Sequence, residues 1–321
     1  MVINIEKVIA NLKENDNIVL LCHKSPDGDT IGSAFGLMYI LLDMGKNVRV
    51  ECEDEFPKGL IFAVGEYEIP EFEPSYVISV DISDVALMGE EISKKYADRV
   101  DMAIDHHRTH KSFAKEEYVV PTAAATAEII YYIAKEMKID ITKRIANSIY
   151  LGLATDTGCF KYSNVTKNTF YAAGDLSELG ADTAIINKRV FDTKSRKRVE
   201  IEGIVASSIE YYFDDKCAIV KLPFDFAEKH GADEEDMAGV TNIPRQIEGV
   251  EISAIIKEKD DGICKISVRA EEYINAALVC NAFDGGGHYA AAGCRIEGDL
   301  DTAKEKLLAV IEKRLREVNV I

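Results

Sequence analysis

The sequence predicts an α/β protein, with a doubly wound, mainly parallel sheet joined by a helical linker to a smaller α+β domain at the C-terminal end. In the first half, short apolar runs alternate with helix-length amphipathic segments, a pattern typical of βαβ units. After about residue 210, alternating polar and apolar residues indicate strands that are covered on one face. The length of 321 residues is enough for two domains. We place these domains at 1–190 and 211–321, with the linker over 191–210.

The expected strands of the first domain are short, continuous apolar stretches, and they cover residues 18–22, 48–52, 76–80 and 100–104. Its expected helices are longer, and they cover residues 4–15, 31–44, 84–97, 122–137, 142–155, 166–179 and 182–191. Either Asp29 or Thr30 can cap the second of these helices. Residues 57–75 contain three prolines and are expected to form a loop with short turns.

The second domain begins after a charged connecting helix, which is expected over residues 194–210. Its strands are expected to cover residues 216–222, 250–256 and 263–269. Asp260-Asp261-Gly262 is a typical hairpin turn between the last two strands. Helices are expected over residues 275–283 and 300–318.

The net charge of −18 argues against a protein that grips long nucleic acid, because such proteins neutralise phosphates with Lys and Arg. It is compatible with a site for a small anion if metal cations supply the positive charge. The seven cysteines are scattered and form no Cys-x-x-Cys pair, as expected for reduced thiols in the cytosol. We find no signal-peptide pattern and no apolar run of about 18 residues, so we expect a cytoplasmic protein without a membrane span.

Acids and imidazoles follow several expected elements at the point where each element ends. They fall in four segments, His23-Lys24-Ser25-Pro26-Asp27-Gly28-Asp29, Asp81, Asp105-His106-His107 and Asp156. The first three stand at the carboxyl ends of expected parallel strands, which meet at the edge where open α/β sheets place their active sites. Asp156, at a helix terminus, could complete the cluster.

Taken singly, each segment has a purely structural alternative. Residues 26–29 could form a tight turn and N-cap, Asp81 could cap a helix, and residues 156–158 could be a helix C-terminal turn. Taken together, so many carboxylates would repel one another, and cations would relieve that repulsion. A mixed carboxylate and imidazole set suits Mn²⁺, Mg²⁺, Fe²⁺ or Co²⁺. A structural zinc site is not expected, because the set contains no cysteine. The sequence therefore favours a metal site, and two metals that share one carboxylate would be an arrangement used in phosphoryl hydrolysis.

In order, these segments resemble the motifs of the DHH phosphoesterase family, which is named after the triplet at residues 105–107. Residues 23–29 are similar to the first motif, Val80-Asp81 to the second, and Asp156-Thr157-Gly158-Cys159-Phe160 to the fourth. The second domain resembles the DHHA1 domain through Phe283-Asp284-Gly285-Gly286-Gly287-His288 and Ala291-Ala292-Gly293. The resemblance covers most of the chain.

The resemblance implies two Mn²⁺ ions in the active site, with Mg²⁺ or Co²⁺ as alternatives. The ligands of one metal would be His23, Asp27 and Asp81. The ligands of the other would be Asp29, Asp81, His106 and Asp156. A hydroxide bridging both metals would attack phosphorus, Asp105 would orient an imidazole, and His107 would face the phosphate as a hydrogen-bond donor or proton source. His110 and His230 have no place in this scheme and are expected to be surface residues.

In the second domain, the resemblance implies that the substrate is held by Arg269, Gly286, Gly287 and His288, and Arg245 is a further candidate. The alternatives are an exposed strand charge for Arg269 and a flexible turn for the glycines. The chain departs from the family signature at Asp284, where a fourth glycine is usual, and at Ala270, where serine is usual. These departures place the choice of substrate in question, rather than the hydrolysis.

The length and motif spacing resemble the branch that degrades short oligonucleotides (nano-RNA, linear dinucleotides) and 3′-phosphoadenosine 5′-phosphate. The expected partners are therefore short RNA or DNA or small nucleotides, without long nucleic acid or membrane, and a homodimer is left open. Two enzymatic alternatives are a family II-like inorganic pyrophosphatase and a RecJ-like single-strand exonuclease. A non-enzymatic alternative is a nucleotide sensor, which would be expected to lack some metal ligands.

Overall fold

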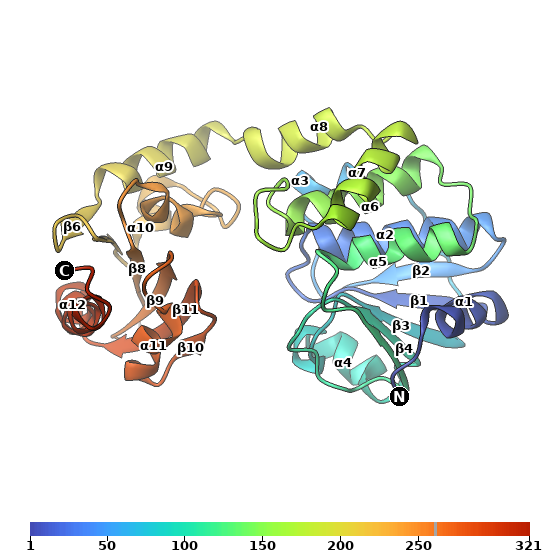
Figure 1. Ribbon diagram of the computed structural model, residues 1–321, viewed down its shortest axis with the longest axis horizontal. Coiled ribbons are helices and arrows are strands. Elements are labelled where there is room, and N and C mark those ends of the chain that lie inside the picture. The colour runs from blue at the N-terminus through green and yellow to red at the C-terminus, as the bar shows by residue number, and fades with distance from the viewer. Residues whose placement is uncertain (260–261) are drawn as a thin grey trace. The chain divides into compact units, whose positions relative to one another are not determined.

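The computed structural model describes residues 1–259 and 262–321, and it consists of two compact units (Figure 1). We call Met1–Thr193 the N-terminal unit and Lys194–Ile321 the C-terminal unit. The hairpin turn expected at Asp260-Asp261-Gly262 falls mostly on residues 260 and 261, which lie outside the described residues. Within the described part of the chain, no helix combines the length and apolar character needed to cross a membrane.

The N-terminal unit is built on a five-stranded parallel sheet in the order β2-β1-β3-β4-β5. Its strands are β1 (Ile18–Leu21), β2 (Val48–Glu51), β3 (Tyr76–Val80), β4 (Met102–Asp105) and β5 (Glu116–Val119). Strands β2 and β3 flank β1 on opposite sides, so the winding direction reverses between β1 and β3. In open α/β sheets, ligands bind in the crevice outside the carboxyl ends of the strands at this point.

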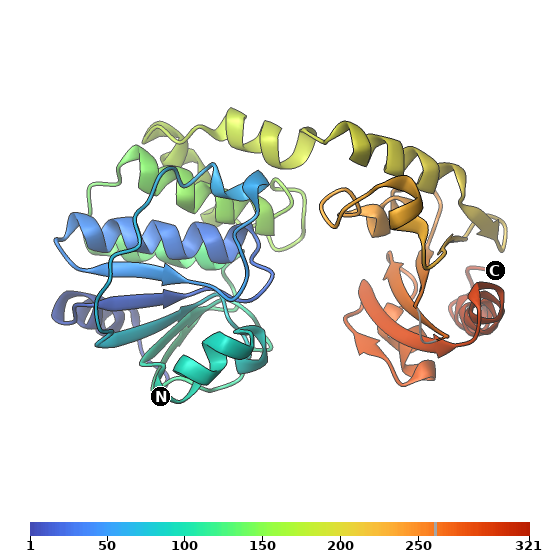
Figure 2. The same cartoon turned by 180° about the vertical axis from the view of Figure 1, so that it is seen from behind.

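Helices cover both faces of this sheet (Figures 1 and 2). The helices of one face are α2 (Gly28–Asp43), α5 (Thr126–Glu136) and α6 (Lys143–Asp156), which share the main hydrophobic core with the strands. On the other face lies α4 (Glu90–Tyr96), over a second cluster. The remaining helices are α1 (Ile5–Glu14), α3 (Lys58–Ile61), α7 (Lys167–Glu178) and α8 (Thr183–Asn187), which leads into a π-helical turn at Lys188–Asp192.

Helix α2 begins earlier than expected, because Asp27 rather than Asp29 or Thr30 is its N-cap. The Asp27 carboxylate accepts hydrogen bonds from the backbone N–H groups of Asp29 and Thr30.

The close contact between α2 and α6 depends on a glycine in each helix. A Cβ on Gly32 would lie 2.3 Å from the carbonyl oxygen of Ser148, and a Cβ on Gly152 would lie 2.8 Å from Oδ1 of Asp29.

The single helix expected over residues 84–97 is wrong. The segment contains a 3₁₀ turn (Val85–Leu87), then α4, then a second 3₁₀ turn (Ala97–Arg99). The break falls at Gly89, whose φ of +88° suits glycine. The carboxylate of Glu53 then caps α4, accepting from the N–H groups of Glu90, Glu91 and Ile92.

The C-terminal unit contains a six-stranded mixed sheet in the order β10-β11-β9-β8-β7-β6. Its strands are β6 (Glu210–Tyr212), β7 (Cys217–Leu222), β8 (Ile252–Glu258), β9 (Ile263–Ala270), β10 (Gly286–Gly287) and β11 (Ala291–Glu297). Helices α11 (Ala276–Cys280) and α12 (Leu300–Glu317) pack on one face. The other face is partly covered by α9 (Arg196–Ser207), and α10 (Phe226–His230) lies in the connection after β7.

Candidate active site

The polar segments of the N-terminal unit meet at the carboxyl edge of its sheet. His23 lies just beyond β1, Asp81 directly follows β3, and Asp105 is the last residue of β4. Asp156 is the last residue of α6, and Asp29 lies in the first turn of α2. The predicted ligands thus converge on the point where the winding of the sheet reverses.

His23, Asp27 and Asp81 form one group of potential ligand atoms. Nε2 of His23 is 3.5 Å from Oδ1 of Asp27 and 3.9 Å from Oδ2 of Asp81. The other ring nitrogen of His23, Nδ1, is 2.8 Å from the carbonyl oxygen of Lys24. Because a carbonyl can only accept, Nδ1 carries the hydrogen, and Nε2 presents its lone pair to the group.

His106 is at the centre of a second group with Asp29 and Asp156. Its Nε2 lies 3.8 Å from Oδ2 of Asp29, 3.4 Å from Oδ2 of Asp156 and 3.8 Å from Oδ1 of Asp81. Nδ1 of His106 is 3.3 Å from the carbonyl oxygen of Ala123, which again leaves Nε2 as the free nitrogen.

Asp81 faces both groups, because its two carboxylate oxygens point to different histidines. Oδ2 is toward His23 and Oδ1 is toward His106, while the side chain is only 2% exposed. The hydroxyl of Thr126 donates to Oδ1 at 2.8 Å. The backbone of Asp81 has a φ of +61°, a left-handed conformation that is uncommon outside glycine. Strain of this kind is concentrated at functional sites.

Without a bound cation, the carboxylates of this cluster repel one another. Burial and the charges of Asp29 and Asp27 hold the pKa of Asp81 well above its ordinary value. Burial, with a further contribution from Asp29, raises the pKa of Asp156 to about 7. A divalent cation would remove this repulsion, and the carboxylates with two free imidazole nitrogens are a fitting donor set for Mn²⁺ or Mg²⁺.

The imidazoles that Asp105 holds are those of His107 and His110, rather than that of the predicted ligand His106. Oδ1 of Asp105 accepts from Nδ1 of His107 at 2.8 Å, and its Oδ2 accepts from Nδ1 of His110 at 2.6 Å. It contacts His106 through the backbone N–H, at 2.7 Å, while the His106 ring is oriented by Ala123 instead. Burial would raise the pKa of Asp105, but the hydrogen bonds from His107 and His110 outweigh it and hold that pKa well below its usual range.

The expectation that His110 is a surface residue is wrong, because its side chain is only 6% exposed and packs beside the site. A backbone hydrogen bond from His110 to the carbonyl of His107 closes a turn that brings the ring back to Asp105. In the sequence, the signal for this contact is the spacing of three residues between His107 and His110, but that spacing does not distinguish a turn from an extended loop. His230, in contrast, is partly exposed and contacts the ring of Phe226.

In the C-terminal unit, two arginines lie close to each other. Arg269 on β9 is half-buried, and its guanidinium donates to the carbonyl oxygen of Val268 at 3.0 Å. Burial, and then the neighbouring charge of Arg245, lower the pKa of Arg269. Arg245 pairs with Glu271 at 3.1 Å, whereas no acid lies within ion-pair distance of Arg269 among residues 1–259 and 262–321. An incompletely neutralised positive pair of this kind suits an anion.

Of the two departures from the family signature, neither interrupts this arrangement. Ala270 is 2% exposed and points into the core, on the opposite face of β9 from Arg269. Asp284 has a φ of +54°, a conformation that glycine adopts freely and aspartate tolerates better than most residues. Glycine and aspartate are therefore both compatible with the backbone at residue 284.

The need for glycine differs among the three positions before His288. A Cβ on Gly285 would lie 2.4 Å from the carbonyl oxygen of Gly293, and Gly287 has a φ of +150° in the hairpin of β10 and β11. Gly286, however, has open space where a Cβ would stand. His288 is exposed, and its backbone N–H donates to the carbonyl of Ala291 at 2.8 Å. Packing therefore explains Gly285 and Gly287 but leaves Gly286 unexplained.

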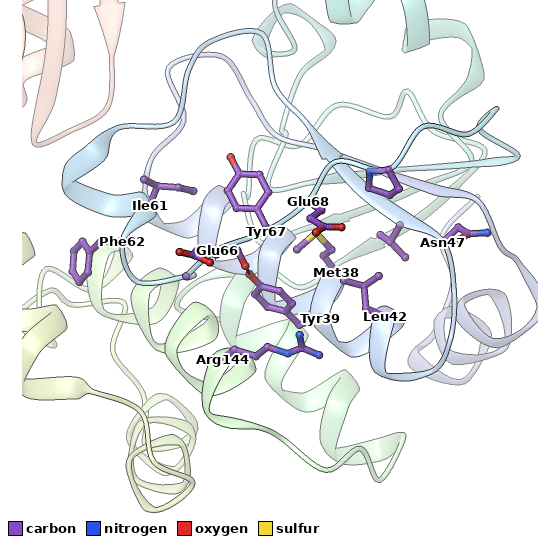
Figure 3. Close-up of a pocket in the computed structure, with 13 residues that line it drawn as sticks. Met38, Tyr39, Leu42, Asn47, Ile61, Phe62, Glu66, Tyr67, Glu68 and Arg144 are labelled. Atoms are coloured by element: carbon purple, nitrogen blue, oxygen red, sulfur yellow. Dashed lines mark hydrogen bonds between the residues drawn. The ribbon is translucent and has the colours of Figure 1, made fainter.

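A hollow of the N-terminal unit lies at the far end of α2 from the cluster (Figure 3). Tyr39 and Arg144 meet on its wall, with the guanidinium 4.8 Å from the ring centroid, and Tyr67 lines it from the loop after α3. None of the predicted ligands lines this hollow. The convergent polar chemistry is therefore at the carboxyl edge of the sheet, not here.

Comparison with known proteins follows the same division of the chain. The model of the DHH family N-terminal domain matches residues 17–153, and that of the DHHA1 domain matches residues 214–317. The chain is 30% identical over 302 residues to a bifunctional oligoribonuclease and PAP phosphatase of Thermus thermophilus, covering 93% of this chain and 90% of that protein. A Bacillus subtilis protein of the same description is 25% identical, with coverage of 97% and 98%.

Solved structures give the same fold. The crystal structure of an exopolyphosphatase-related protein from Bacteroides fragilis matches with a TM-score of 0.88 and 27% identity, covering 98% of this chain and 97% of that one. The exonuclease RecJ of Thermus thermophilus, solved in complex with Mn²⁺, matches with a TM-score of 0.53 and 13% identity, covering 96% of this chain and 55% of RecJ. The second likeness concerns the fold alone.

Proposed function

The chain belongs to the DHH phosphoesterase family and carries a DHHA1 domain, and from this we propose a two-metal hydrolase that acts on short oligonucleotides and on 3′-phosphoadenosine 5′-phosphate. The observation that carries the proposal is the position of Asp81, which shares one group of potential ligand atoms with His23 and Asp27 and another with His106 and His107. The relatives that match along nearly their whole length support the choice of substrates.

In this proposal, one metal is held by His23, Asp27 and Asp81. The other is held by Asp29, Asp81, His106 and Asp156. Divalent cations at these positions would supply Lewis acidity for phosphoryl hydrolysis, and Mn²⁺ is the ion we expect. The protein keeps the carboxylates in place, since Asp29 accepts from the N–H groups of Thr126 and Ala127 at 2.7 and 2.9 Å.

His107 is the residue that we expect to meet the phosphate. Its Nδ1 is hydrogen-bonded to Asp105, and its side chain is 41% exposed, so Nε2 is the nitrogen available to a ligand. The hydrogen bond with Asp105 raises the pKa of His107, which favours the protonated imidazole. A protonated imidazole can donate a hydrogen bond to a phosphate oxygen or a proton to the leaving oxygen.

The C-terminal unit supplies anion binding through Arg269, Arg245, Gly286, Gly287 and His288. Because no packing requirement explains Gly286, close approach of its backbone to a phosphate is a sufficient reason for glycine there. The net charge of −18 fits short substrates, which do not need an extended basic surface. We also expect the enzyme to act in the cytoplasm, since all seven cysteines are free thiols.

A substrate panel with Mn²⁺ tests the proposal. We expect release of mononucleotide from di- to pentanucleotide RNA and of phosphate from 3′-phosphoadenosine 5′-phosphate. Preferred hydrolysis of pyrophosphate would instead support the pyrophosphatase alternative, and preference for long single strands would support a RecJ-like exonuclease. Nucleotide binding without any turnover would support a sensor.

Replacement of Arg269 by alanine is expected to raise KM for short RNA by roughly 10–100-fold, with a smaller change in kcat, because one charge-assisted contact to the phosphate is lost. Steady-state kinetics measure both constants. Lys265→Ala is the matched control, since Lys265 is an exposed cation on the same strand. A loss confined to kcat would contradict the binding role of Arg269.

Gly286→Ala should mainly affect substrate binding, whereas Gly287→Ala should mainly affect stability. With open space at its Cβ position, Gly286→Ala should change stability by less than about 0.5 kcal/mol but raise KM roughly tenfold. A Cβ on Gly287 would lie 2.5 Å from Cα of Ala292, so Gly287→Ala should destabilise the unit by roughly 1–3 kcal/mol. Denaturant unfolding and kinetics of both variants check this, and an unchanged KM in Gly286→Ala would refute the phosphate contact.

A further inference from the structure

His110 belongs to neither group of predicted metal ligands, yet it is firmly enclosed beside them. Its Nδ1 is 2.6 Å from Oδ2 of Asp105, whose other oxygen, Oδ1, is 2.8 Å from Nδ1 of His107. The Asp105 side chain is fully buried, with an exposed fraction of 0%. The carboxylate is therefore held between two imidazoles, one facing the site and one behind it.

The two oxygens of Asp105 are not equally supported. Oδ1 also accepts from the backbone N–H groups of His106 and His107, at 2.7 and 3.1 Å. For Oδ2, His110 is the hydrogen-bonding partner that the described residues provide. An unpaired oxygen on a fully buried carboxylate is costly, so without this donor the carboxylate would be expected to turn toward another donor.

The His110 ring is enclosed on the side away from the cluster. It packs against Phe113, with centroids 5.4 Å apart, and its buried Nε2 lies 3.8 Å from Oε1 of Glu117 without a hydrogen-bond partner among the described residues. Glu117 on β5 is itself fixed by the hydroxyl of Ser112 and the N–H of Phe113, both at 2.9 Å. Hydrogen bonds thus link His110 to His107 through Asp105, and Phe113 and Glu117 enclose the His110 ring.

An ionised carboxylate can only accept hydrogen bonds, so both imidazoles that contact Asp105 carry a hydrogen on Nδ1. This fixes the tautomer of neutral His107 and directs its Nε2 away from Asp105. We propose that His110 is a positioning residue for the reaction, which locks the Asp105 carboxylate in the orientation that fixes the tautomer and direction of His107. The inference rests on the proposed function, because that function gives His107 its role toward phosphate.

Two amide substitutions separate this role from simple packing. In His110→Asn, the amide nitrogen stands where Nδ1 stood, whereas in His110→Gln it lies one bond further out, near the former Nε2. We expect His110→Gln to lower kcat on short RNA by roughly 10–100-fold with KM changed less than about threefold. His110→Asn should recover at least about tenfold of that loss. His230→Asn, a histidine outside the site, is the control.

A second measurement does not depend on activity. Long-range ¹H–¹⁵N spectra of the metal-free protein, recorded at a pH where the His107 ring is neutral, report its tautomer directly. We expect the Nδ1–H form in the wild type and in His110→Asn, and a mixture of tautomers in His110→Gln. Should His110→Gln fail to fold in a thermal melt, the His107 tautomer in His110→Asn still decides, since a changed tautomer there would overturn the inference.

Three kinetic results would also overturn it: equal kcat in wild type and His110→Gln, an effect confined to KM, or equally low kcat in both variants. If the wild type hydrolyses nothing in the substrate panel, the proposed function fails. The His107 spectra would still test the positioning role in that case.

Discussion

Asp81→Asn is expected to lower turnover of short RNA on the order of 10³-fold, the largest effect of any single substitution in the cluster. Both oxygens of Asp81 are engaged, one toward His23 and one toward His106, so the change weakens both proposed metal positions at once. Asparagine is the appropriate replacement because it tolerates the φ of +61° at this position better than alanine.

Isothermal titration with Mn²⁺ and kinetics measured on the same preparation check this prediction. Metal stoichiometry should fall together with kcat. Asp84→Asn is the matched control, since Asp84 lies three residues further on, caps a 3₁₀ turn and pairs with Lys111. Full turnover in Asp81→Asn would refute the two-metal assignment, and a comparable loss in Asp84→Asn would indicate a general structural effect.

Removal of divalent metal is the second change with a large expected effect. Chelation should abolish turnover, and Mn²⁺ should restore it. The ion should also stabilise the N-terminal unit, because it neutralises carboxylates that repel one another. At a Mn²⁺ concentration of about 100 times Kd, the expected gain is about 2.7 kcal/mol, or a rise in Tm of roughly 5–10 °C. Calorimetry with and without chelator measures this shift.

The metal-free protein should also lose stability as pH rises. The pKa of Asp81 is raised well above its ordinary value and that of Asp156 is raised to about 7, so the folded state holds protons that the unfolded chain releases near pH 4. The stabilising effect of these protons is complete at low pH and is lost as pH rises through about 7. The metal-free Tm should therefore be lower at about pH 8 than at about pH 5.5, and bound Mn²⁺ should reduce the difference. A metal-free Tm that rises over this range would contradict the raised pKa values.

The position of the cluster could be predicted from the sequence because each signal is local. A buried parallel strand needs a continuous apolar run, and the run ends where the chain returns to solvent, so Asp81 and Asp105 mark strand ends directly. Strand β5 was missed because it lies at the sheet edge, where Glu116 and Glu117 are tolerated. Strand β11 was missed because it begins with small residues, of which Ala292 and Gly293 pair with β10.

The sequence does not indicate which residue each polar group contacts. The interruption before α4 depends on Glu53, which is distant along the chain and caps that helix through three backbone N–H groups. The burial of His110 likewise depends on Glu117 and Phe113, which lie beside it in the structure where β5 pairs with β4. Such contacts are set by tertiary structure, so neither could be assigned from spacing.

The contact between α2 and α6 bears on which ion the proposed metal site would select. Gly152 has no side chain to coordinate anything, yet a Cβ there would meet Oδ1 of Asp29 at 2.8 Å and Cβ of Ala127 at 2.6 Å. Asp29 would have to move to make room, and the distance between its carboxylate and the facing His106 would change. Mg²⁺ demands short, nearly ideal octahedral bonds, whereas larger ions accept longer ones. The spacing of two helices can therefore tune which cation fits, while every donor atom remains the same.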